Sequence, residues 1–295
     1  MKTSNKIKNK KYTPIFMVFP VVVLLTAFLL GPALAGFAMT FMKTSLSGEV
    51  SFVGFGNYLA LFREGGRFFN NLWVTLVYVL ADICITIPFA YVTALLITRD
   101  SFLSRFFRSV YLIPWISAPV VSTLMVKTML NSDFGIIHII VKNIVGHDVY
   151  ILNDGTLALI VMILHSFWRS APFIMLFLAA GISTIPKEIY EAARVDGASK
   201  VTSFFRLTLP MTLNQLGIGT LMVTIWTIQD SESVYALTQG GPGYATETLA
   251  VRLFKSSFVN FDLNMGATLG VFLIIISIIF MTLYLKMLLR GNLYD

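Results

Sequence analysis

The chain has 295 residues, of which 56% are hydrophobic and only 13% are charged, and its mean hydropathy is +0.78. Ordinary soluble domains carry roughly 25% charged residues, so a water-soluble fold could not bury this much apolar surface. The composition therefore indicates an integral membrane protein. The net charge of +7 would suggest a nucleic-acid partner in a soluble protein, but here the distribution of cations between the two membrane faces explains it. The single cysteine excludes an internal disulfide, and the three histidines lack metal-ligand spacing.

Six apolar stretches are long enough to cross a bilayer, which takes about 20 mainly apolar residues. Runs of this length exclude barrel strands, and helices are then the remaining way to satisfy the backbone in lipid. The first stretch exceeds the apolar part of a signal peptide, roughly 7–15 residues, so we expect it to be retained. The sequence therefore predicts an all-α integral membrane protein. The six predicted transmembrane helices are Thr13–Phe41, Asn71–Ile97, Phe107–Leu130, Leu157–Gly181, Met211–Tyr235 and Met265–Leu289.

Between the third and fourth predicted spans, "FGIIHIIVKNIVGH" places apolar residues at helical spacing with a glycine near each end. This pattern predicts a short helix that lies flat on the outer membrane surface.

Lysine and arginine positions set the orientation, because cytoplasmic loops are enriched in them. With the N-terminus inside, fourteen of the 22 lie on inner segments, seven on outer segments, and Arg169 within a span. This bias predicts that both termini are cytoplasmic. Residues 1–70, with the first helix and its outer loop, are predicted to be an addition to a five-helix core at 71–289, and residues 290–295 to be a cytoplasmic tail.

The segment "IPKEIYEAARVDGASKVTSFFRLTLP", residues 185–210, carries seven charged residues between two apolar stretches. Pro186 suits the first turn of a helix, and good helix formers follow it. Gly197 tolerates the left-handed conformation that ends a helix, and Ser199 is a candidate N-cap for a second one. The sequence predicts a helix, a turn and a second helix on the cytoplasmic side. Their apolar faces pack either on the inner ends of the bundle or against a cytoplasmic partner.

This segment resembles the EAA loop of permease subunits of bacterial ABC importers. The family pattern is E-A-A, three residues, G, nine residues and I-x-L-P, and only Leu207 departs from it, where the family usually has Ile. The resemblance implies an ABC importer type I permease fold, in which this loop forms coupling helices that sit in a groove of an ATPase subunit, with Glu191 and Gly197 central. The residues assigned to ATPase coupling are Glu191, Ala192, Ala193, Asp196, Gly197, Leu209 and Pro210.

The stretch "LTQGGPGYATETL", Leu237–Leu249, follows the fifth predicted span, and its glycines break a helix and allow close backbone approach. Alone it reads as a helix-terminating turn. The pattern T-x-G-G-P followed by T-x-x-L is similar to carbohydrate-type importer permeases, as are "LIPWISAP" and "SFWRSAPF". The similarity runs from about Asn71 to the C-terminus. It resembles maltose-transporter permeases, without their extra N-terminal spans and large outer domain.

The same resemblance implies a set of sugar contacts in three core spans. Aromatic faces stack on sugar rings, and hydroxyls and carboxylates bond sugar hydroxyls, although each residue alone is compatible with helix packing. Several positions depart from the family's residues, so the ligand can differ. The matched positions are Trp115 and Pro119 in the third span, Ser166, Ser170 and Phe173 in the fourth, and Trp226, Thr227 and Asp230 in the fifth.

Asp82, Arg169, Asp230 and Glu232 are ionisable residues that lie within predicted spans. Insertion of such a group costs at least about 2.5–3.5 kcal/mol, so these groups tend to face a cavity or each other. We expect Arg169 and Asp230 to line the translocation path, with a direct pair as one arrangement. For Asp82 we expect a structural hydrogen bond to a neighbouring span.

The sequence predicts the permease subunit of an ABC importer for a sugar or sugar derivative in the bacterial cell membrane. The alternative is a polyol, glycerol-phosphate or other non-sugar solute. No G-x-x-x-x-G-K-[ST] motif is present, so we expect no catalysis and no cofactor or metal here, with ATP and Mg bound by partner ATPase subunits. The expected partners are a second homologous permease, two ATPase subunits, an extracellular solute-binding protein and the lipid membrane, and no nucleic acid. A membrane enzyme and a passive channel or ion-coupled carrier are the rival classes.

Overall fold

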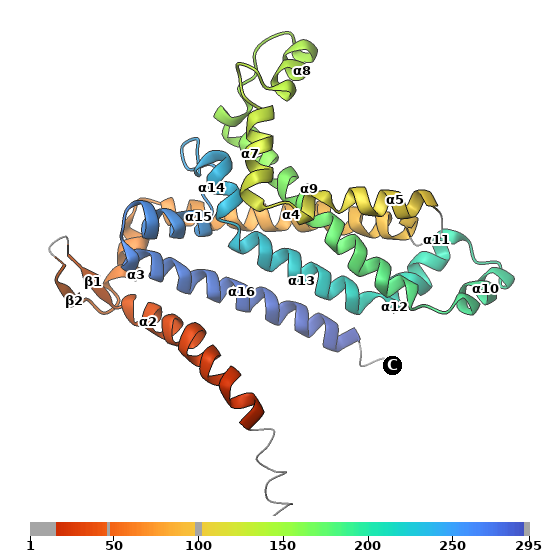
Figure 1. The fold of residues 1–295 in the computed structure, drawn as a ribbon, viewed down its shortest axis with the longest axis horizontal. Helices are drawn as coiled ribbons and strands as arrows, with labels where there is room; N and C mark the ends of the chain where they lie inside the picture. Colours follow the sequence, from red (N-terminus) through yellow and green to blue (C-terminus); the bar gives the residue numbers. More distant parts are fainter. Residues whose placement is uncertain (1–15, 46–47, 98–101, 292–295) are drawn as a thin grey trace, which may run out of the picture.

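The computed structural model describes residues 16–45, 48–97 and 102–291, and its regular structure is mostly helical. Four helices run side by side along the long axis of the molecule and form the bundle (Figure 1). They are α4 (Arg67–Ile97), α9 (Gly155–Ser183), α13 (Leu213–Gln229) and α16 (Leu263–Gly291).

Among the described residues, four helices are long and apolar enough to cross a membrane, and a bent pair of helices forms a fifth candidate. The four are Phe16–Met39, Arg67–Ile97, Gly155–Ser183 and Leu263–Lys286. They correspond to the first, second, fourth and sixth predicted spans. The other two predicted spans are not continuous helices, and each is interrupted for a local reason.

The third predicted span is broken at Ser117 and Ala118, where two helices meet at an angle of 98°. A proline disfavours the helical conformation of the residue before it, and Ala118, which precedes Pro119, is extended with φ −60° and ψ 135°. The third predicted span is therefore a bent pair of helices and not one continuous helix. The segments on either side are α5 (Phe102–Tyr111), α6 (Ile113–Ile116) and α7 (Pro119–Met129).

The fifth predicted span ends early, because α13 stops at Gln229 and α14 (Glu232–Thr238) starts a new direction. Asp230 between them has ψ 84°, and its carboxylate accepts a hydrogen bond of 3.0 Å from the backbone N–H of Ser233. Short polar side chains compete with helix continuation in this way. The chain reaches α13 through α12 (Leu209–Met211).

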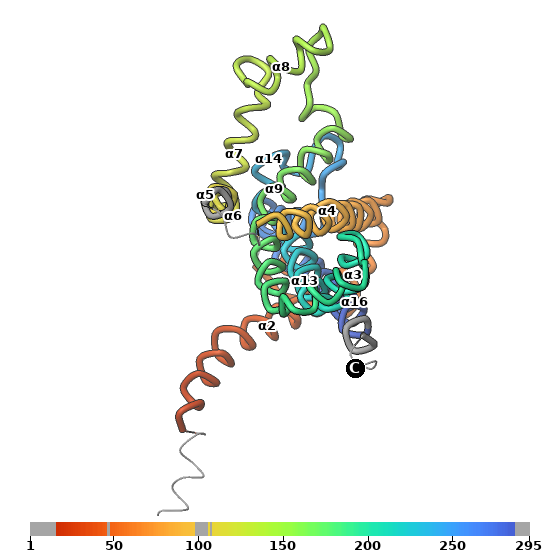
Figure 2. Tube along the Cα trace, turned by 90° about the vertical axis from the view of Figure 1, so that its right-hand side faces the viewer, coloured from red at the N-terminus to blue at the C-terminus, as the bar shows by residue number. Residues whose placement is uncertain are grey.

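Helix α8 (Ile136–Val145) is the short helix predicted between the third and fourth spans. It ends at Gly146, which is left-handed with φ 85°. The Asp148 carboxylate contacts two side chains of α8: the buried His138 at 3.1 Å and the exposed Lys142 at 2.9 Å. Helices α7 and α8 project from the bundle on the side opposite to the first helix (Figures 1 and 2). The placement of α8 on the membrane surface stays a prediction.

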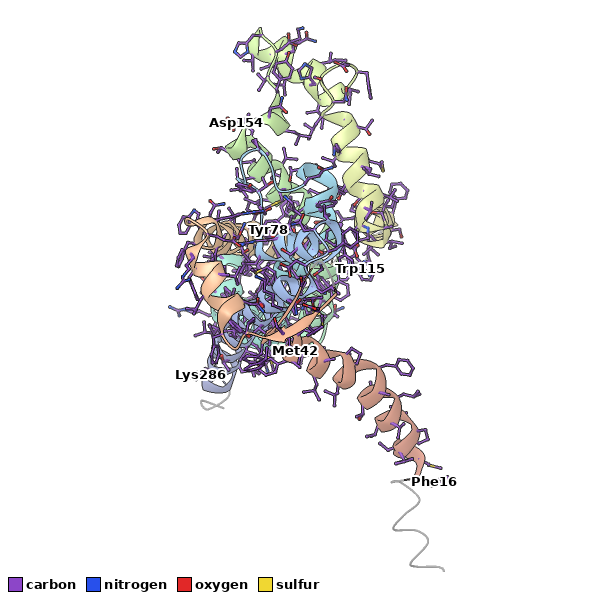
Figure 3. The ribbon with its side chains drawn as sticks, turned by 90° about the vertical axis from the view of Figure 1, so that its left-hand side faces the viewer. Phe16, Met42, Tyr78, Trp115, Asp154 and Lys286 are labelled. Atoms are coloured by element: carbon purple, nitrogen blue, oxygen red, sulfur yellow. The ribbon has the colours of Figure 1, made fainter. Side chains whose placement is uncertain are left out.

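The first helix, Phe16–Met39, stands away from the bundle, and none of its most apolar window is buried. Figure 3 shows its side chains pointing into open space up to Phe16. It contains a wider turn, η1 (Thr26–Leu30), followed by α2 (Gly31–Met39). The rest of this predicted span, residues 13–15, lies outside the described residues, as do the N-terminal lysines, Arg99 and the end of the predicted tail at 292–295.

The two ends of the bundle carry different elements (Figure 1). One end has the hairpin of β1 (Met42–Thr44) and β2 (Val50–Phe52), antiparallel with Met42 opposite Phe52, and the other has the segment predicted as cytoplasmic. The first end also holds α3 (Gly56–Arg63), α15 (Leu249–Phe254) and η4 (Lys255–Val259). The opposite end holds α10 (Lys187–Val195), α11 (Lys200–Ser203) and η3 (Phe204–Thr208). A single turn, η2 (Ile151–Asn153), precedes α9.

The buried core lies between α4, α9 and α13, where Tyr91, Ala94, Ile174, Leu178 and Val223 pack together. Two smaller clusters continue the core toward the end with the β-hairpin. The interruptions in the third and fifth predicted spans lie beside this core, and they leave a space between the helices.

Candidate functional site

A cavity of about 300 Å³ lies where the two helix interruptions face α9. Backbone that leaves the helical conformation inside a membrane has to be buried in protein or line a water-filled space. The cavity is lined by Trp115, Ser117, Pro119, Ser166, Arg169, Ser170, Trp226, Thr227, Gln229, Asp230, Ser231 and Glu232.

Three aromatic rings form a continuous group at this cavity. Trp115 stacks on Phe173 with ring centroids 4.9 Å apart, and Phe173 meets Trp226 edge-on at 5.2 Å. The two tryptophans line the cavity, whereas Phe173 supports both of them without lining it. Figure 3 shows Trp115 at the flank of the bundle. Such a group offers a flat apolar surface beside polar side chains, which suits an amphipathic ring.

Asp82 lies completely buried on α4 behind the cavity lining. One carboxylate oxygen accepts hydrogen bonds from Ser166 at 2.7 Å and Thr227 at 2.6 Å, and the other accepts one from Thr86 at 2.7 Å. These bonds connect α4 to α9 and α13. The predicted structural hydrogen bond from Asp82 to a neighbouring span is confirmed, with two spans instead of one.

Arg169 and Asp230 both line the cavity, but they do not form an ion pair within 4.0 Å. The Arg169 guanidinium donates to the Ser233 hydroxyl at 2.8 Å, while Asp230 accepts from the Tyr78 hydroxyl at 3.1 Å and from the Ser233 N–H. The direct pair considered from the sequence is therefore wrong. Ser233 stands between the two groups, because α14 starts at the break and turns its first residues toward α9.

The charged segment at the other end folds as a helix, a turn and a second helix, as its glycine and capping residues predict. Pro186 is the N-cap of α10, Gly197 has φ 77°, and the Ser199 hydroxyl accepts from the Thr202 N–H at 3.1 Å. The Tyr190 hydroxyl lies 2.9 Å from that of Thr208 and attaches α10 to the following helix.

The outward face of this segment is uncovered. Val195 is 88% exposed, Val201 66% and Phe205 61%, and Glu191 makes only a surface ion pair of 3.8 Å with Arg194. A second cavity of about 760 Å³ lies between the segment and the C-terminal ends of α4 and α9. The apolar residues of the segment are thus only partly packed on the chain's own bundle. Of the other residues assigned to coupling, Ala193 and Leu209 are half-buried, and Ala192, Asp196 and Pro210 are exposed.

Residues 53–288 match the family described as binding-protein-dependent transport system inner membrane component. The chain belongs to this family. Over 280 residues this permease is 28% identical to the sulfoquinovosyl glycerol transport system permease protein SmoG of Agrobacterium fabrum, covering 93% of this chain and 89% of that one. It is 29% identical to the arabinooligosaccharides transport system permease protein AraP of Bacillus subtilis, covering 95% of this chain and 89% of the relative.

The fold of this permease is that of an ABC importer permease. It matches a chain in the crystal structure of a bacterial ABC transporter involved in the import of the acidic polysaccharide alginate, with a TM-score of 0.84 at 19% identity. The match covers 97% of this permease and 98% of that chain.

The glycine-rich stretch after α14 encloses a buried carboxylate in this permease. Gly240 has φ 86°, and a Cβ there would lie 3.0 Å from the Cβ of Glu247, which is a close approach that only glycine allows. Glu247 is completely buried and accepts hydrogen bonds from Arg67 at 2.8 and 2.9 Å, Lys255 at 2.9 Å and Asn71 at 3.0 Å. Burial alone would raise the pKa of Glu247, but these hydrogen bonds outweigh burial and lower the pKa below its ordinary value.

The structure brings seven of the eight residues matched to sugar contacts to one cavity, together with Arg169, and the eighth, Phe173, supports two of them. The match by motif did not include Ser117, Gln229, Ser231 and Glu232, which also line it. Their polarity beside Pro119 and Asp230 was the available signal, since polar residues next to a helix break tend to face a cavity. Glu247 received no role from the sequence, because its partners lie up to 180 residues away.

Proposed function

We propose that this permease moves a sugar or sugar derivative across the cell membrane through the cavity between its broken helices. The observation that carries the proposal is the lining itself: a stacked aromatic group surrounded by hydroxyls, an amide and carboxylates at the side of the core. Sugar rings have apolar faces and polar rims, and sites that bind them combine these two kinds of surface. The relatives that transport sulfoquinovosyl glycerol and arabinooligosaccharides support the same class of solute.

The alternative solute is a polyol, glycerol-phosphate or another non-sugar compound. Arg169 could receive a phosphate, but it is the one cationic side chain in a lining that also holds the carboxylates of Asp230 and Glu232. At formal charges the carboxylates outnumber the guanidinium, which opposes a doubly charged anion. This balance favours a neutral sugar over glycerol-phosphate.

We infer that the exposed face of α10 and α11 is the surface that an ATPase subunit binds. Its support is the uncovered apolar side chains beside the E-A-A pattern in residues 185–210. Two ATPase subunits would hold ATP and Mg, a second permease would complete the path, and a solute-binding protein would deliver the sugar from outside. Coupling by rigid contact between two-state elements would then open the cavity alternately to each side.

The same proposal includes the topology. It places six spans with two interrupted helices in the membrane, both termini and the coupling segment in the cytoplasm, and the β-hairpin end outside. Residues 71–289 would form the common core, with 1–70 as an addition and 290–295 as a cytoplasmic tail. Cysteine labelling from one side of the membrane at position 48, and separately at position 198, tests the orientation.

Uptake into cells that express the whole importer tests the solute class. We expect accumulation of at least one radiolabelled compound from a panel of maltose, trehalose, arabinotriose, mannotriose, glycerol and sn-glycerol-3-phosphate, and loss of that accumulation in Trp226→Ala. Uptake of sn-glycerol-3-phosphate alone would replace the sugar proposal with the alternative. Uptake that survives without ATP would replace it with a carrier or channel.

A pull-down of the detergent-solubilised chain tests the coupling segment. We expect an ATPase and a second permease to co-purify with the wild type, and the ATPase to be lost from Glu191→Lys and Gly197→Pro. Glu188→Lys makes the same charge change one turn earlier on α10 and is the matched control, which should keep the ATPase. If the wild type recovers no ATPase, the assignment of this segment is wrong.

A further inference from the structure

Four of the five hydroxyl groups that line the cavity, all except that of Ser231, share one property: each has a hydrogen bond to an acceptor inside the protein. Ser117 donates to the Pro114 carbonyl at 2.7 Å, and Ser170 donates to the Ser166 carbonyl at 2.8 Å. Ser166 donates to Asp82 at 2.7 Å. A hydroxyl has one proton and two lone pairs, so a hydroxyl that donates internally can only accept on its other side.

Thr227 follows the same pattern with a choice of two acceptors. Its hydroxyl lies 2.6 Å from the Asp82 carboxylate and 2.8 Å from the Val223 carbonyl. The bond to Asp82 is the shorter of the two, so Asp82 is the better acceptor for the proton. Either acceptor turns the proton away from the cavity.

Asp82 is the common partner behind this lining, and its surroundings are unusual for a buried acidic group. Its two oxygens receive three hydroxyls, and no lysine or arginine of the described chain lies within ion-pair distance of it. An ionised carboxylate accepts and never donates, so it fixes the direction of every hydroxyl that points at it. A protonated carboxyl would have to donate to one of them.

We propose that Asp82 is a specificity-determining positioning residue, whose ionised carboxylate draws the protons of Ser166 and Thr227 out of the cavity so that the lining accepts hydrogen bonds from a neutral polyhydroxylated solute. This inference rests on the proposed sugar function and narrows it. It adds a reason for selectivity that is separate from the carboxylates in the lining.

The expected selectivity depends on whether the solute can donate hydrogen bonds to the lining. Sugar hydroxyls donate readily, and they would meet the lone pairs of four serine and threonine hydroxyls together with the carboxylates of Asp230 and Glu232. A carboxylate, sulfonate or phosphate has no proton to offer and would face these lone pairs unpaired. Arg169 is the charged donor of the lining; one of its five N–H groups donates to Ser233, and the carboxylates of Asp230 and Glu232 offset its charge.

Binding of paired trisaccharides to the purified permease–ATPase complex tests the proposal, without the solute-binding protein and its own selectivity. Mannotriose and trimannuronate differ only at C6, as do galactotriose and trigalacturonate, and Trp115 and Trp226 in the lining report binding by fluorescence. We expect the wild type to bind the neutral member of a pair at least tenfold more tightly. In Asp82→Asn the amide can donate to a hydroxyl and turn its proton into the cavity, so we expect this preference to fall at least fivefold.

Thr86→Val is the matched control, because it removes a hydrogen bond from the same carboxylate on the side away from the cavity. It should keep the neutral-to-anionic preference of the wild type. An unchanged preference in Asp82→Asn, or an equal fall in Thr86→Val, would overturn the positioning role and leave Asp82 a structural residue.

Infrared spectroscopy tests the placement of the proton directly and needs no solute. The difference spectrum of wild type minus Asp82→Asn should contain an ionised carboxylate stretch, and a protonated carboxyl stretch in its place would overturn the proposal. If no neutral trisaccharide binds the wild type, the sugar function fails, and the infrared result still decides the state of Asp82. The two failures are therefore distinguishable.

Discussion

Two completely buried carboxylates in this permease are stabilised in opposite ways. Glu247, at the end with the β-hairpin, is held by the cations of Arg67 and Lys255 and by the amide of Asn71. Asp82, in the middle of the bundle, is held by three hydroxyls and has no cation among its partners in the described chain. The first arrangement connects segments through opposite charges. At Asp82, hydrogen bonds from hydroxyl groups are what stabilise the carboxylate.

The difference teaches what each site can do. A buried ion pair is costly to break, because removing one partner leaves the other charge buried without compensation. The Glu247 network therefore suits a fixed joint between α4, the glycine-rich loop and η4. A carboxylate bonded only to hydroxyls can exert its field on the neighbouring space, and at Asp82 that space is the cavity. Four variants break or sharpen this comparison.

The largest loss of stability is expected for Glu247→Gln, which removes the negative charge that Arg67 and Lys255 both contact. Because both cations stay partly buried, at 32% and 24% exposure, we expect a loss of about 3 kcal/mol in the free energy of unfolding, at the low end for a broken buried pair. Thermal unfolding of the purified complex measures it. A midpoint within 1 °C of the wild type would mean that the network contributes no net stability.

The contribution of Glu247 to stability depends on pH. The folded state lowers the pKa of Glu247, chiefly because hydrogen bonds from Arg67, Lys255 and Asn71 outweigh burial. A lowered pKa contributes stability that is complete above the unfolded value, about 4.3, and is lost as the pH falls through the folded value. We expect acidification below about pH 4 to destabilise the wild type more than Glu247→Gln. Parallel pH profiles for the two proteins would contradict this.

A smaller loss of stability is expected for Asp82→Asn, because an amide oxygen keeps part of the hydroxyl hydrogen bonding and no cation is left uncompensated. Hydrogen bonds to a charged group contribute about 1.5–3 kcal/mol, so a net loss of about 1–2 kcal/mol follows when part of them survives. The same unfolding measurement compares it with Glu247→Gln. An equal or larger loss than at Glu247 would reverse the comparison.

Trp115→Ala separates solute affinity from stability. It removes the ring that stacks on Phe173 at 4.9 Å, so we expect about tenfold weaker binding of the preferred trisaccharide, equivalent to about 1.4 kcal/mol, with little change in unfolding. Trp73→Ala is the control, because Trp73 is 67% exposed on α4 and lies outside the cavity lining. Equal effects from both tryptophans would remove the aromatic group from the proposed site.

The smallest change in stability is expected for Asp148→Asn. The Asp148 carboxylate also binds a lysine and a histidine, but it is exposed to solvent. Hydrogen bonds from Lys142 and then His138 lower the pKa of Asp148, yet water screens both interactions. We expect an unchanged unfolding midpoint and faster hydrogen exchange confined to α8. A global shift in the midpoint would show that burial is not what distinguishes Glu247.

Apolar length is a local property, and the sequence therefore predicted the second, fourth and sixth spans to within a few residues at each end. The interruptions at Ala118 and Asp230 were missed, because a hydropathy window averages over single residues. Both had a local signal, since Ala118 precedes a proline and Asp230 is a short acid followed by Ser231. The helix, turn and helix of residues 185–210 were predictable for the same reason, from Gly197 and Ser199.

The candidate site was only partly predictable. Motif matching brought the right positions together because the motifs follow the three helices that meet at the cavity. It could not assign the partners of Asp82 and Glu247, which lie 145 and 180 residues away for Thr227 and Arg67. Such pairs depend on the packing of whole helices, and no spacing within one segment encodes them. The failure of the expected Arg169–Asp230 pair has the same origin, because α14 inserts Ser233 between the two groups.

The break between α6 and α7 has an electrical consequence. The two extended residues lie at the polar cavity of about 300 Å³, and such a cavity is a conducting space once it opens to water and ions on one side of the membrane. A membrane voltage does not fall across a conducting space; it falls across the insulating part that remains. The whole drop, about 2.3 kcal/mol per elementary charge at 100 mV, is then concentrated on whichever end of the cavity is closed. The closed end therefore has to withstand, over a few helical turns, the field that a lipid bilayer spreads over its full thickness.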